Sequence, residues 1–311
     1  MDLFKRSLLY YNTMGFKDFV TKTLCRLGGK IHVPSKPSVL HVELNNTCNL
    51  NCKMCPREHL TRSPQNMNFE LYKKIVSEVA ELGIPHVRLF LFGEPLLYPK
   101  LIDAIRFAKN AGIKYVDFNT NANLLSQEMA HKIADSGLDE IVFSVDGFSK
   151  ETYESIRIKG NYDKCIKNIE YFLGLLKEEN IKMTTLIQTI NFDAIKDEIE
   201  RYKLFWKDKV NLVSIAELNP VHGLVKEVDY SGCKRVICNE AFYKMVVLSN
   251  GIVTTCCDDF NGELALGDIH KNTIEEIWNG AKWKKLRTDF TKLNYSEYKI
   301  CEKCIMSYKH N

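Results

Sequence analysis

The chain has 311 residues, enough for one large domain and a small one, and its 45% hydrophobic and 26% charged content is typical of a globular protein. The 43 basic and 39 acidic residues leave a net charge of +4, and this excess lies in residues 1–30, so the charge of the remaining chain gives no nucleic-acid-binding signature. No segment has the length and purity of a membrane span and residues 1–6 do not open a signal peptide, so eleven cysteines favour metal or cluster ligation in a reducing cytoplasm over a secreted disulfide scaffold.

Residues 1–37 are predicted to form an N-terminal amphipathic helical segment. One apolar stripe runs through Phe16, Phe19, Val20, Leu24 and Leu27, and the glycines at 28 and 29 end it. Packing of this stripe against the main domain is the favoured interpretation, because amphipathic helices mostly face a core. The alternative is a basic helix resting on a membrane surface.

Strand-like and helix-like stretches then alternate from residue 38 to residue 216. Strands are predicted at 39–44, 86–92, 114–119, 140–145, 181–188 and 210–215. Helices are predicted at 69–82, 101–111, 126–135, 162–177 and 194–206. Six such units in series predict an α/β fold with a parallel sheet that closes into a partial, TIM-like (β/α)6 barrel over residues 38–225. Active-site residues of such barrels gather at the C-terminal ends of the strands.

Three cysteines follow the first predicted strand: Cys48, Cys52 and Cys55 are separated by three and by two residues. Three thiols cannot pair off among themselves, and so short a loop can fold several sulfurs around one inorganic centre. Three ligands are one short of a full set for a four-iron cluster, so one iron would stay open to a group that is not protein. A zinc site with His59 as the fourth ligand is the alternative.

This Cys-x3-Cys-x2-Cys loop resembles the signature of the radical S-adenosylmethionine (radical SAM) superfamily. The resemblance implies a [4Fe-4S] cluster on the three cysteines, with SAM chelating the open iron. One electron from a flavodoxin- or ferredoxin-type donor then cleaves SAM to a 5'-deoxyadenosyl radical that abstracts a hydrogen atom from the substrate.

The same resemblance implies SAM contacts at later strand ends. Gly93-Glu94-Pro95 is similar to the family's Gly-Gly-Glu motif, with Phe92 in place of the first glycine, although this tripeptide is also an ordinary turn. Arg157 is either a ligand of the SAM carboxylate or a surface helix residue. The full implied set of SAM-binding residues is Met54, Gly93, Glu94, Asn121, Ser144, Asp146 and Arg157.

Residues 226–311 are predicted to form a small α+β domain, with a hairpin around Ser249-Asn250-Gly251 and a helix over 273–283. Cys238, Cys256, Cys301 and Cys304 are separated by 17, 44 and 2 residues, which resembles the twitch/SPASM extension of radical SAM enzymes. That resemblance implies one auxiliary [4Fe-4S] cluster on these four cysteines, and hence two clusters in all. A structural zinc is the alternative.

Of the other cysteines, Cys25, Cys165 and Cys233 are predicted to be packing residues. Cys257 lies beside the predicted ligand Cys256, where its thiol could give a hydrogen atom to a substrate radical. The neighbouring Asp258 could bind substrate hydroxyls or accept a proton.

Several functions agree with these residues. The favoured hypothesis is oxidation of a small polar molecule such as a sugar or cyclitol alcohol, because the spacing of the last four cysteines resembles that of 2-deoxy-scyllo-inosamine dehydrogenase. A sugar epimerase using Cys257 or Cys233 and a peptide maturase are the alternatives, the latter disfavoured by a segment 1–37 too short for a peptide-binding domain. A non-catalytic iron–sulfur or zinc protein is disfavoured by the intact Gly93-Glu94-Pro95 and Ser144.

Overall fold

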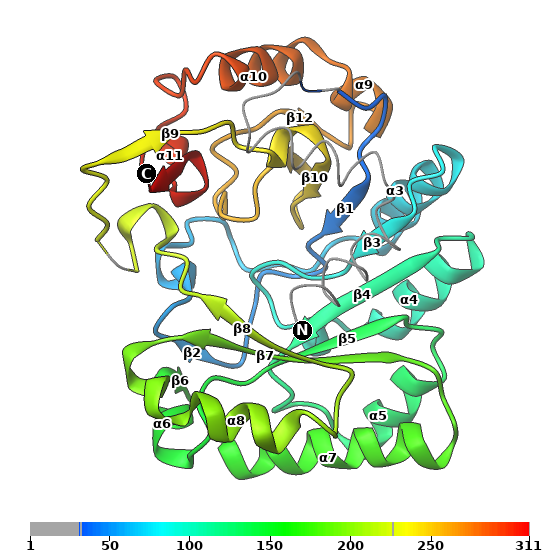
Figure 1. The fold of residues 1–311 in the computed structure, drawn as a ribbon. Coiled ribbons are helices and arrows are strands. Elements are labelled where there is room, and N and C mark those ends of the chain that lie inside the picture. Colours follow the sequence, from blue (N-terminus) through cyan, green and yellow to red (C-terminus); the bar gives the residue numbers. More distant parts are fainter. Residues whose placement is uncertain (1–30, 32, 226, 311) are drawn as a thin grey trace.

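The computed structural model describes residue 31, residues 33–225 and residues 227–310 (Figure 1). The helix predicted within residues 1–30, and any membrane contact through it, lies outside this part of the chain. Across the described ranges, no helix combines the length and apolar character needed to cross a membrane.

Six parallel strands form the predicted partial barrel, so the predicted fold class is confirmed. The strands are β1 (Val39–Val42), β3 (His86–Arg88), β4 (Tyr115–Thr120), β5 (Glu140–Ser144), β7 (Thr184–Asn191) and β8 (Leu212–Glu217). They lie side by side in that order, each parallel to the next. Apolar and polar residues mix along these strands, as in Val39–Val42 (VLHV) and His86–Arg88 (HVR).

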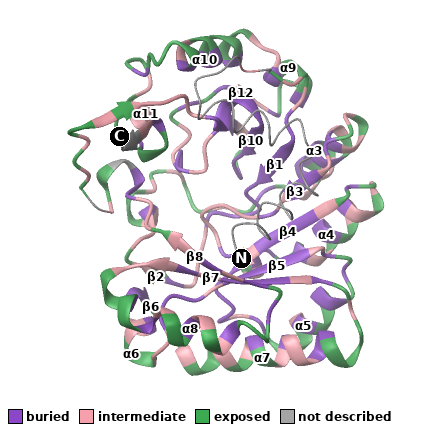
Figure 2. Ribbon diagram, viewed as in Figure 1, coloured by how far each residue is buried: buried purple, intermediate pink, exposed green. Residues whose placement is uncertain are grey.

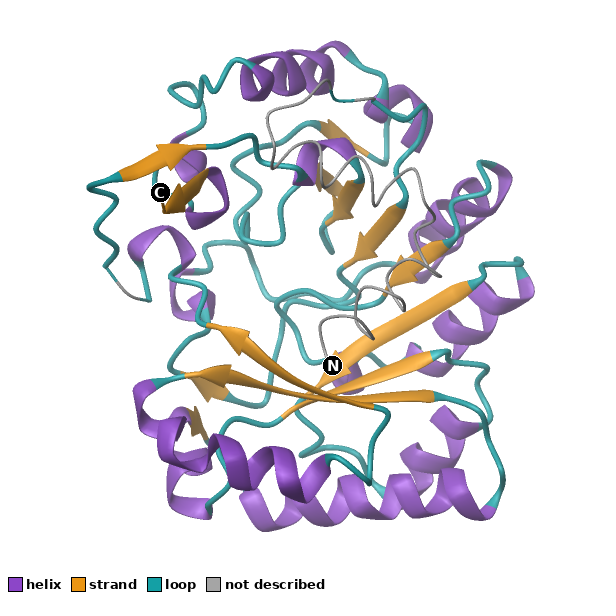
Figure 3. Cartoon of the chain, viewed as in Figure 1, coloured by secondary structure: helices purple, strands orange, loops and turns teal. Residues whose placement is uncertain are grey.

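Helices cover the outer face of the barrel, as Figure 3 shows. They are α3 (Phe69–Glu81), α4 (Leu101–Asn110), α5 (Gln127–Ala134), α6 (Lys150–Ile156), α7 (Tyr162–Glu178) and α8 (Ile199–Trp206). Asn68 and the predicted cap Ser126 accept backbone N–H groups at the starts of α3 and α5. The inward faces of the helices are buried and their outward faces exposed (Figure 2), as their 3.6-residue periodicity requires.

The sheet does not stop at the barrel. β10 (Lys244–Val247) pairs in parallel with β1, and β11 (Ile252–Thr254) and β12 (Gly267–Asp268) extend the sheet antiparallel to nine strands. The predicted hairpin is thus confirmed, with Gly251 at φ 82° in its turn. One contiguous hydrophobic core runs from beneath the barrel helices to Trp278 and Trp283 of the C-terminal domain.

The single helix predicted over 273–283 is wrong, because the structure breaks it into α9 (Ile274–Trp278) and α10 (Ala281–Thr291). Thr273 and Glu276 form a capping box at the start of α9, and the chain turns at Gly280. A Cβ at position 280 would lie 2.9 Å from the Glu276 carbonyl oxygen, so this turn requires glycine.

Smaller elements complete the chain. These are the strands β2 (Asn51–Cys52), β6 (Arg157–Ile158), β9 (Cys233–Arg235) and β13 (Tyr308–His310), the helix α11 (Lys299–Glu302), and 3-10 turns at Pro56–His59, Pro95–Leu97, Asp193–Glu198, Val221–Gly223, Glu240–Phe242 and Ile305–Ser307. β2 pairs with β6 and β9 with β13, both antiparallel. The turn at Asp193–Glu198 replaces the first part of the helix predicted at 194–206.

A buried ion pair ties the two domains together. Arg62 donates two hydrogen bonds to the Glu43 carboxylate, with Nη1–Oε2 at 2.7 Å and Nη2–Oε1 at 2.8 Å. The same carboxylate accepts the Ser249 backbone N–H, and Arg62 Nε donates to the Phe260 carbonyl. Side-chain exposure is 8% for Arg62 and 0% for Glu43, so solvent does not screen the pair.

We expect Arg62→Met to lower the free energy of unfolding by about 3 kcal/mol, because the substitution leaves the Glu43 carboxylate buried without its cation. Lys73→Met is the matched control, since Lys73 pairs with an exposed glutamate, Glu70, and should cost less than about 1 kcal/mol. Anaerobic chemical denaturation of both variants measures the difference. Equal denaturation midpoints would contradict a stabilising role for the Arg62 pair.

Candidate active site

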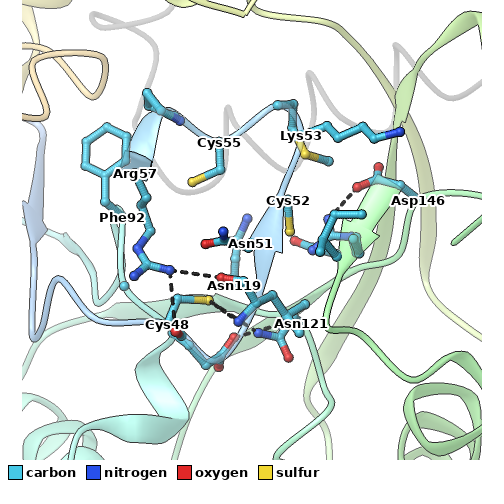
Figure 4. Close-up of a pocket in the computed structure, with 18 of the residues that line it drawn as sticks. Cys48, Asn51, Cys52, Lys53, Cys55, Arg57, Phe92, Asn119, Asn121 and Asp146 are labelled. Carbon is cyan, nitrogen blue, oxygen red and sulfur yellow. Dashed lines mark hydrogen bonds and ion pairs between the residues drawn. The ribbon is translucent and has the colours of Figure 1, made fainter. Parts of the chain in front are cut away.

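A cavity of about 590 Å³, which we call the SAM-sized cavity, lies at the C-terminal ends of the barrel strands (Figure 4). Cys48, Cys52 and Cys55 all line it. So does every residue predicted to bind SAM: Met54, Gly93, Glu94, Asn121, Ser144, Asp146 and Arg157. The structure therefore brings all ten residues to one site. His59 does not line this cavity; its half-exposed ring lies 3.5 Å from the Glu58 carboxylate, so zinc ligation through His59 is not supported.

Backbone contacts fix the cysteine loop in this cavity. β2 carries Cys52 and pairs with β6, so that Cys52 lies opposite Arg157. Arg57 Nη1 donates to the carbonyl oxygens of Leu50 at 3.0 Å and Cys48 at 3.4 Å, which closes the loop on itself. The pairing with β6 was not anticipated, because two-residue strands leave no periodic pattern in the sequence.

Burial makes the three thiols poor acids when the site holds only protein. It raises the pKa of Cys48 and Cys55, and it raises the pKa of Cys52 to about 11. The charges of Arg57 and Arg157 act in the opposite direction but do not cancel the effect. Three thiolates here need a positively charged centre beside them, which agrees with a metal cluster as the occupant.

The Glu94 carboxylate faces protein donors around the cavity. It accepts hydrogen bonds from Thr120 Oγ1 at 2.7 Å and from the backbone nitrogens of Asn121 at 2.9 Å and Leu96 at 3.2 Å. Burial nevertheless raises its pKa. Glu94 therefore joins the segment after β3 to the end of β4.

Gly93 and Asn121 both lie in close contact with other residues of the site. A Cβ at position 93 would lie 1.8 Å from Asn45 Oδ1, so any other residue would displace the adjoining turn. Asn121 Nδ2 donates to Asn49 Oδ1 at 2.9 Å and lies 3.8 Å from Cys48 Sγ. The amide thus positions the first cysteine of the loop.

Arg157 and Asp146 form a buried pair across the cavity wall, with Nη2 and Oδ2 2.6 Å apart. Asp146 Oδ1 accepts the Ile190 backbone N–H at 2.7 Å, which fixes the carboxylate. Arg157 is buried, so its interpretation as a surface residue is wrong. Its Nε has no hydrogen-bond partner in the part of the chain that the structure describes.

The four C-terminal cysteines share a second, enclosed cavity in the C-terminal domain. Cys238, Cys256 and the neighbouring pair Cys301 and Cys304 come from three separate segments and line it together with Leu264, Phe290, Tyr295 and Ile300. Burial raises the pKa of Cys301 and of Cys304 to about 12. We call this space the four-cysteine cavity.

A third cavity, of about 240 Å³, lies between the barrel lumen and the C-terminal domain, and we call it the lumen cavity. Its polar lining consists of His41, His86, Arg88, Asn219, Glu240, Tyr243, Lys244, Cys256, Cys257 and Asp258. Glu240 and Cys256 line the four-cysteine cavity as well. The predicted catalytic residues Cys257 and Asp258 therefore lie in the lumen and not in the SAM-sized cavity.

Hydrogen bonds and ion pairs order this lumen. Asn219 Nδ2 donates to both Asp258 oxygens, at 2.9 and 2.8 Å, and the buried Lys244 forms an ion pair with Glu240. His41 and Lys244 were missed by sequence reasoning. The available signal was a polar residue at an alternate position of an apolar strand, because such a position faces inward.

The three cysteines predicted to be packing residues are Cys25, Cys165 and Cys233. Cys165 is fully buried in the core, as a packing residue would be, and its thiol donates to the Asn121 carbonyl. Cys233 lies on β9, away from all three cavities. Cys25 lies outside the described residues.

Comparison with known proteins shows which families the two parts of this chain match. Residues 42–202, just over half of the chain, match the radical SAM superfamily, and residues 238–305 match SPASM, an iron–sulfur cluster-binding domain. A GTP 3',8-cyclase of Chlorobaculum tepidum is 26% identical over 201 residues, which cover 63% of this chain and 59% of that protein. The chain thus spans less than two thirds of the length of this relative.

Two solved structures share the fold. BtrN in complex with AdoMet and 2-DOIA has a TM-score of 0.60 at 18% identity and covers 86% of this chain and 92% of its own. SuiB of Streptococcus suis, bound to its precursor peptide SuiA, has a TM-score of 0.69 at 16% identity and covers 82% of this chain and 68% of its own. The chain therefore belongs to the radical SAM superfamily and carries a C-terminal SPASM domain, with [4Fe-4S] clusters and SAM as its cofactors.

Proposed function

We propose that this protein oxidises an alcohol carbon of a small polar molecule such as a sugar or cyclitol. One observation carries the proposal: the four-cysteine cavity and the polar lumen cavity share Cys256 and Glu240. An electron acceptor beside the substrate space is what an oxidation requires, whereas a reaction that returns a hydrogen atom to the substrate does not need one. BtrN, a radical SAM dehydrogenase of similar fold, supports the same direction weakly.

We assign the SAM-binding cluster to Cys48, Cys52 and Cys55, and an auxiliary cluster to the four C-terminal cysteines. When bound, these clusters and SAM supply the radical that removes a carbon-bound hydrogen atom and the acceptor for the electron left behind. The buried thiols fit this role because a cationic cluster offsets the cost of their charge.

In this proposal the chain's own residues orient SAM. Arg157 donates from its unpartnered Nε to the SAM carboxylate, and Asp146, fixed by Ile190, receives the amino group. Met54 packs against the adenine, and Ser144 bonds the ribose. Glu94 acts through Asn121, whose position it fixes.

The lumen residues handle the substrate. The Asp258 carboxylate, held by Asn219, accepts the hydroxyl proton as the carbon–oxygen double bond forms. The paired charges of Lys244 and Glu240 line the same cavity and offer hydrogen bonds to further hydroxyl groups.

Epimerisation is the second candidate, and one observation favours it. Cys257 lines the lumen cavity, while its neighbour Cys256 also faces the four-cysteine cavity. A thiol in the lumen could return a hydrogen atom to a substrate radical. Peptide modification rests on the fold shared with neighbours such as SuiB and has no observation of its own in the described residues.

The cysteine assignment predicts iron content. Anaerobically reconstituted protein should hold about eight irons per chain, and joint substitution of Cys48, Cys52 and Cys55 by Ala should leave about four. The pair Cys301→Ala and Cys304→Ala should also leave about four, while the control Cys233→Ser should keep all of them. Metal analysis gives the counts, and wild-type protein with four irons and one zinc would overturn the auxiliary cluster.

The position of Glu94 predicts a defect in SAM binding at unchanged iron content. Glu94→Ala should weaken SAM binding by about 10-fold or more, because Thr120 and Asn121 lose a charged acceptor. The SAM affinity of Glu94→Gln, which keeps one carbonyl acceptor, should lie between those of Glu94→Ala and wild type. Equilibrium dialysis measures the affinity for SAM, and Glu151→Ala, at an exposed position, is the control. Unaltered SAM affinity in Glu94→Ala would show that Glu94 only stabilises the turn and has no part in SAM binding.

Substitution of Cys257 distinguishes oxidation from epimerisation. With SAM, a reductant and a panel of sugar and cyclitol alcohols, we expect a ketone product together with 5'-deoxyadenosine. Cys257→Ala should retain ketone formation, whereas the pair Cys301→Ala and Cys304→Ala should form 5'-deoxyadenosine without ketone. Mass spectrometry in deuterated water reads the outcome: deuterium at the reacting carbon that disappears in Cys257→Ala would establish epimerisation instead.

A further inference from the structure

A groove of about 540 Å³ lies on the surface of the C-terminal domain beside α10. Lys282, Lys285 and Lys299 line it, together with Glu263 and Glu297. Its apolar lining comes from Leu264, Ala265, Leu266, Tyr298 and Ile300. None of these residues belongs to the SAM-sized cavity or the lumen cavity.

The groove adjoins the four-cysteine cavity. Leu264 and Ile300 line both spaces, and Ile300 immediately precedes Cys301. The groove and the cavity therefore share part of their wall, so a carrier seated in the groove would lie close to a cluster held by the cysteines. The same cavity meets the lumen cavity at Glu240, Cys256 and Met306.

Charge distinguishes the segment that carries α10 and α11 from residues 31–280. Residues 281–304 contain seven basic and three acidic residues, whereas residues 31–280 contain 29 basic and 34 acidic ones. Six of the seven basic side chains are exposed lysines: Lys282, Lys284, Lys285, Lys292, Lys299 and Lys303. Three of these lysines, Lys282, Lys285 and Lys299, line the groove, and their positive charge attracts an acidic surface and accelerates its approach at low ionic strength.

We propose that this groove is the docking surface for a small acidic one-electron carrier protein of the flavodoxin or ferredoxin type. The inference rests on the proposed auxiliary cluster. Oxidation of an alcohol leaves one electron at the four-cysteine site per turnover, and the oxidised carrier accepts that electron and leaves reduced, with no bond made or broken. The electron enters from the lumen side and departs through the groove side.

Other occupants fit the charge less well. Residues 1–30 contain six basic and two acidic residues, so their charge does not favour binding to a lysine-lined groove. A second copy would bring the same lysines face to face. Electron-transfer partners also need only a small interface, which a groove of this size with a charged rim can supply.

The test is a charge reversal with a matched control. Lys282→Glu with Lys299→Glu alters the groove and leaves the paired Lys285 in place. Lys164→Glu with Lys167→Glu makes the same charge change on exposed positions of α7, at the opposite end of the molecule (Figure 1). Reduced flavodoxin is mixed with each oxidised protein at low ionic strength, and the flavin absorbance gives the electron-transfer rate.

We expect the groove variant to react about 10-fold more slowly than wild type and the α7 variant to match wild type. The wild-type rate should fall as salt is added, while reduction by dithionite stays equal in all proteins. Equal rates in the two variants, or a wild-type rate independent of salt, would overturn the docking surface.

The same comparison in protein with Cys48, Cys52 and Cys55 replaced by Ala isolates the auxiliary cluster. The 10-fold difference should persist there. If it vanishes, the carrier serves the other cluster and the groove assignment is wrong. Iron analysis of each protein keeps this result separate from failure of the auxiliary cluster itself, because a chain without that cluster would be recognised by its lower iron count.

Discussion

The parallel pairing of β1 with β10 is the constraint on which the rest of the structure depends. Val39–Val42 lies against Lys244–Val247 in register, so the C-terminal domain continues the barrel sheet instead of being joined to it only by a linker. Ser249, just beyond β10, is bonded to the Glu43 carboxylate one residue past β1. The relation between the two cysteine sites is thereby set by a hydrogen-bonded ladder and a buried ion pair, which resist bending more than a flexible linker would.

Paired charges order the barrel interior at several levels. Asp117 accepts from His86 and Arg88, and Asp146 pairs with Arg157 nearer the strand ends. Charges buried in pairs cost far less than isolated ones, and their positions are fixed before a ligand arrives. Within the described chain, Nδ1 of the buried His41 and Nδ1 of the buried His86 have no hydrogen-bond partner. The lumen cavity is therefore lined by two imidazole rings that each keep one nitrogen without a hydrogen bond.

The four-cysteine cavity has two unlike sides. The side toward the lumen carries the paired charges of Glu240 and Lys244, which suit a polar substrate. The side toward solvent is aliphatic, with Leu264 and Ile300, and the groove beyond it is rimmed by lysines. An electron acceptor placed between the two would be shielded from water while remaining close to both.

Much of the fold and of the SAM-sized site was predictable because the signals are local. The Cys48–Cys55 loop spans few residues, the caps lie within one turn of their helices, and the strands and helices differ in period. What only the tertiary structure decided depends on residues far apart in sequence. The inward direction of Arg157, the internal bonding of Glu94, the division of Cys256 and Cys257 between two cavities and the β1–β10 ladder all arise from such contacts. No local pattern encodes them, because they are chosen by the burial and pairing of groups that meet only once the chain has closed.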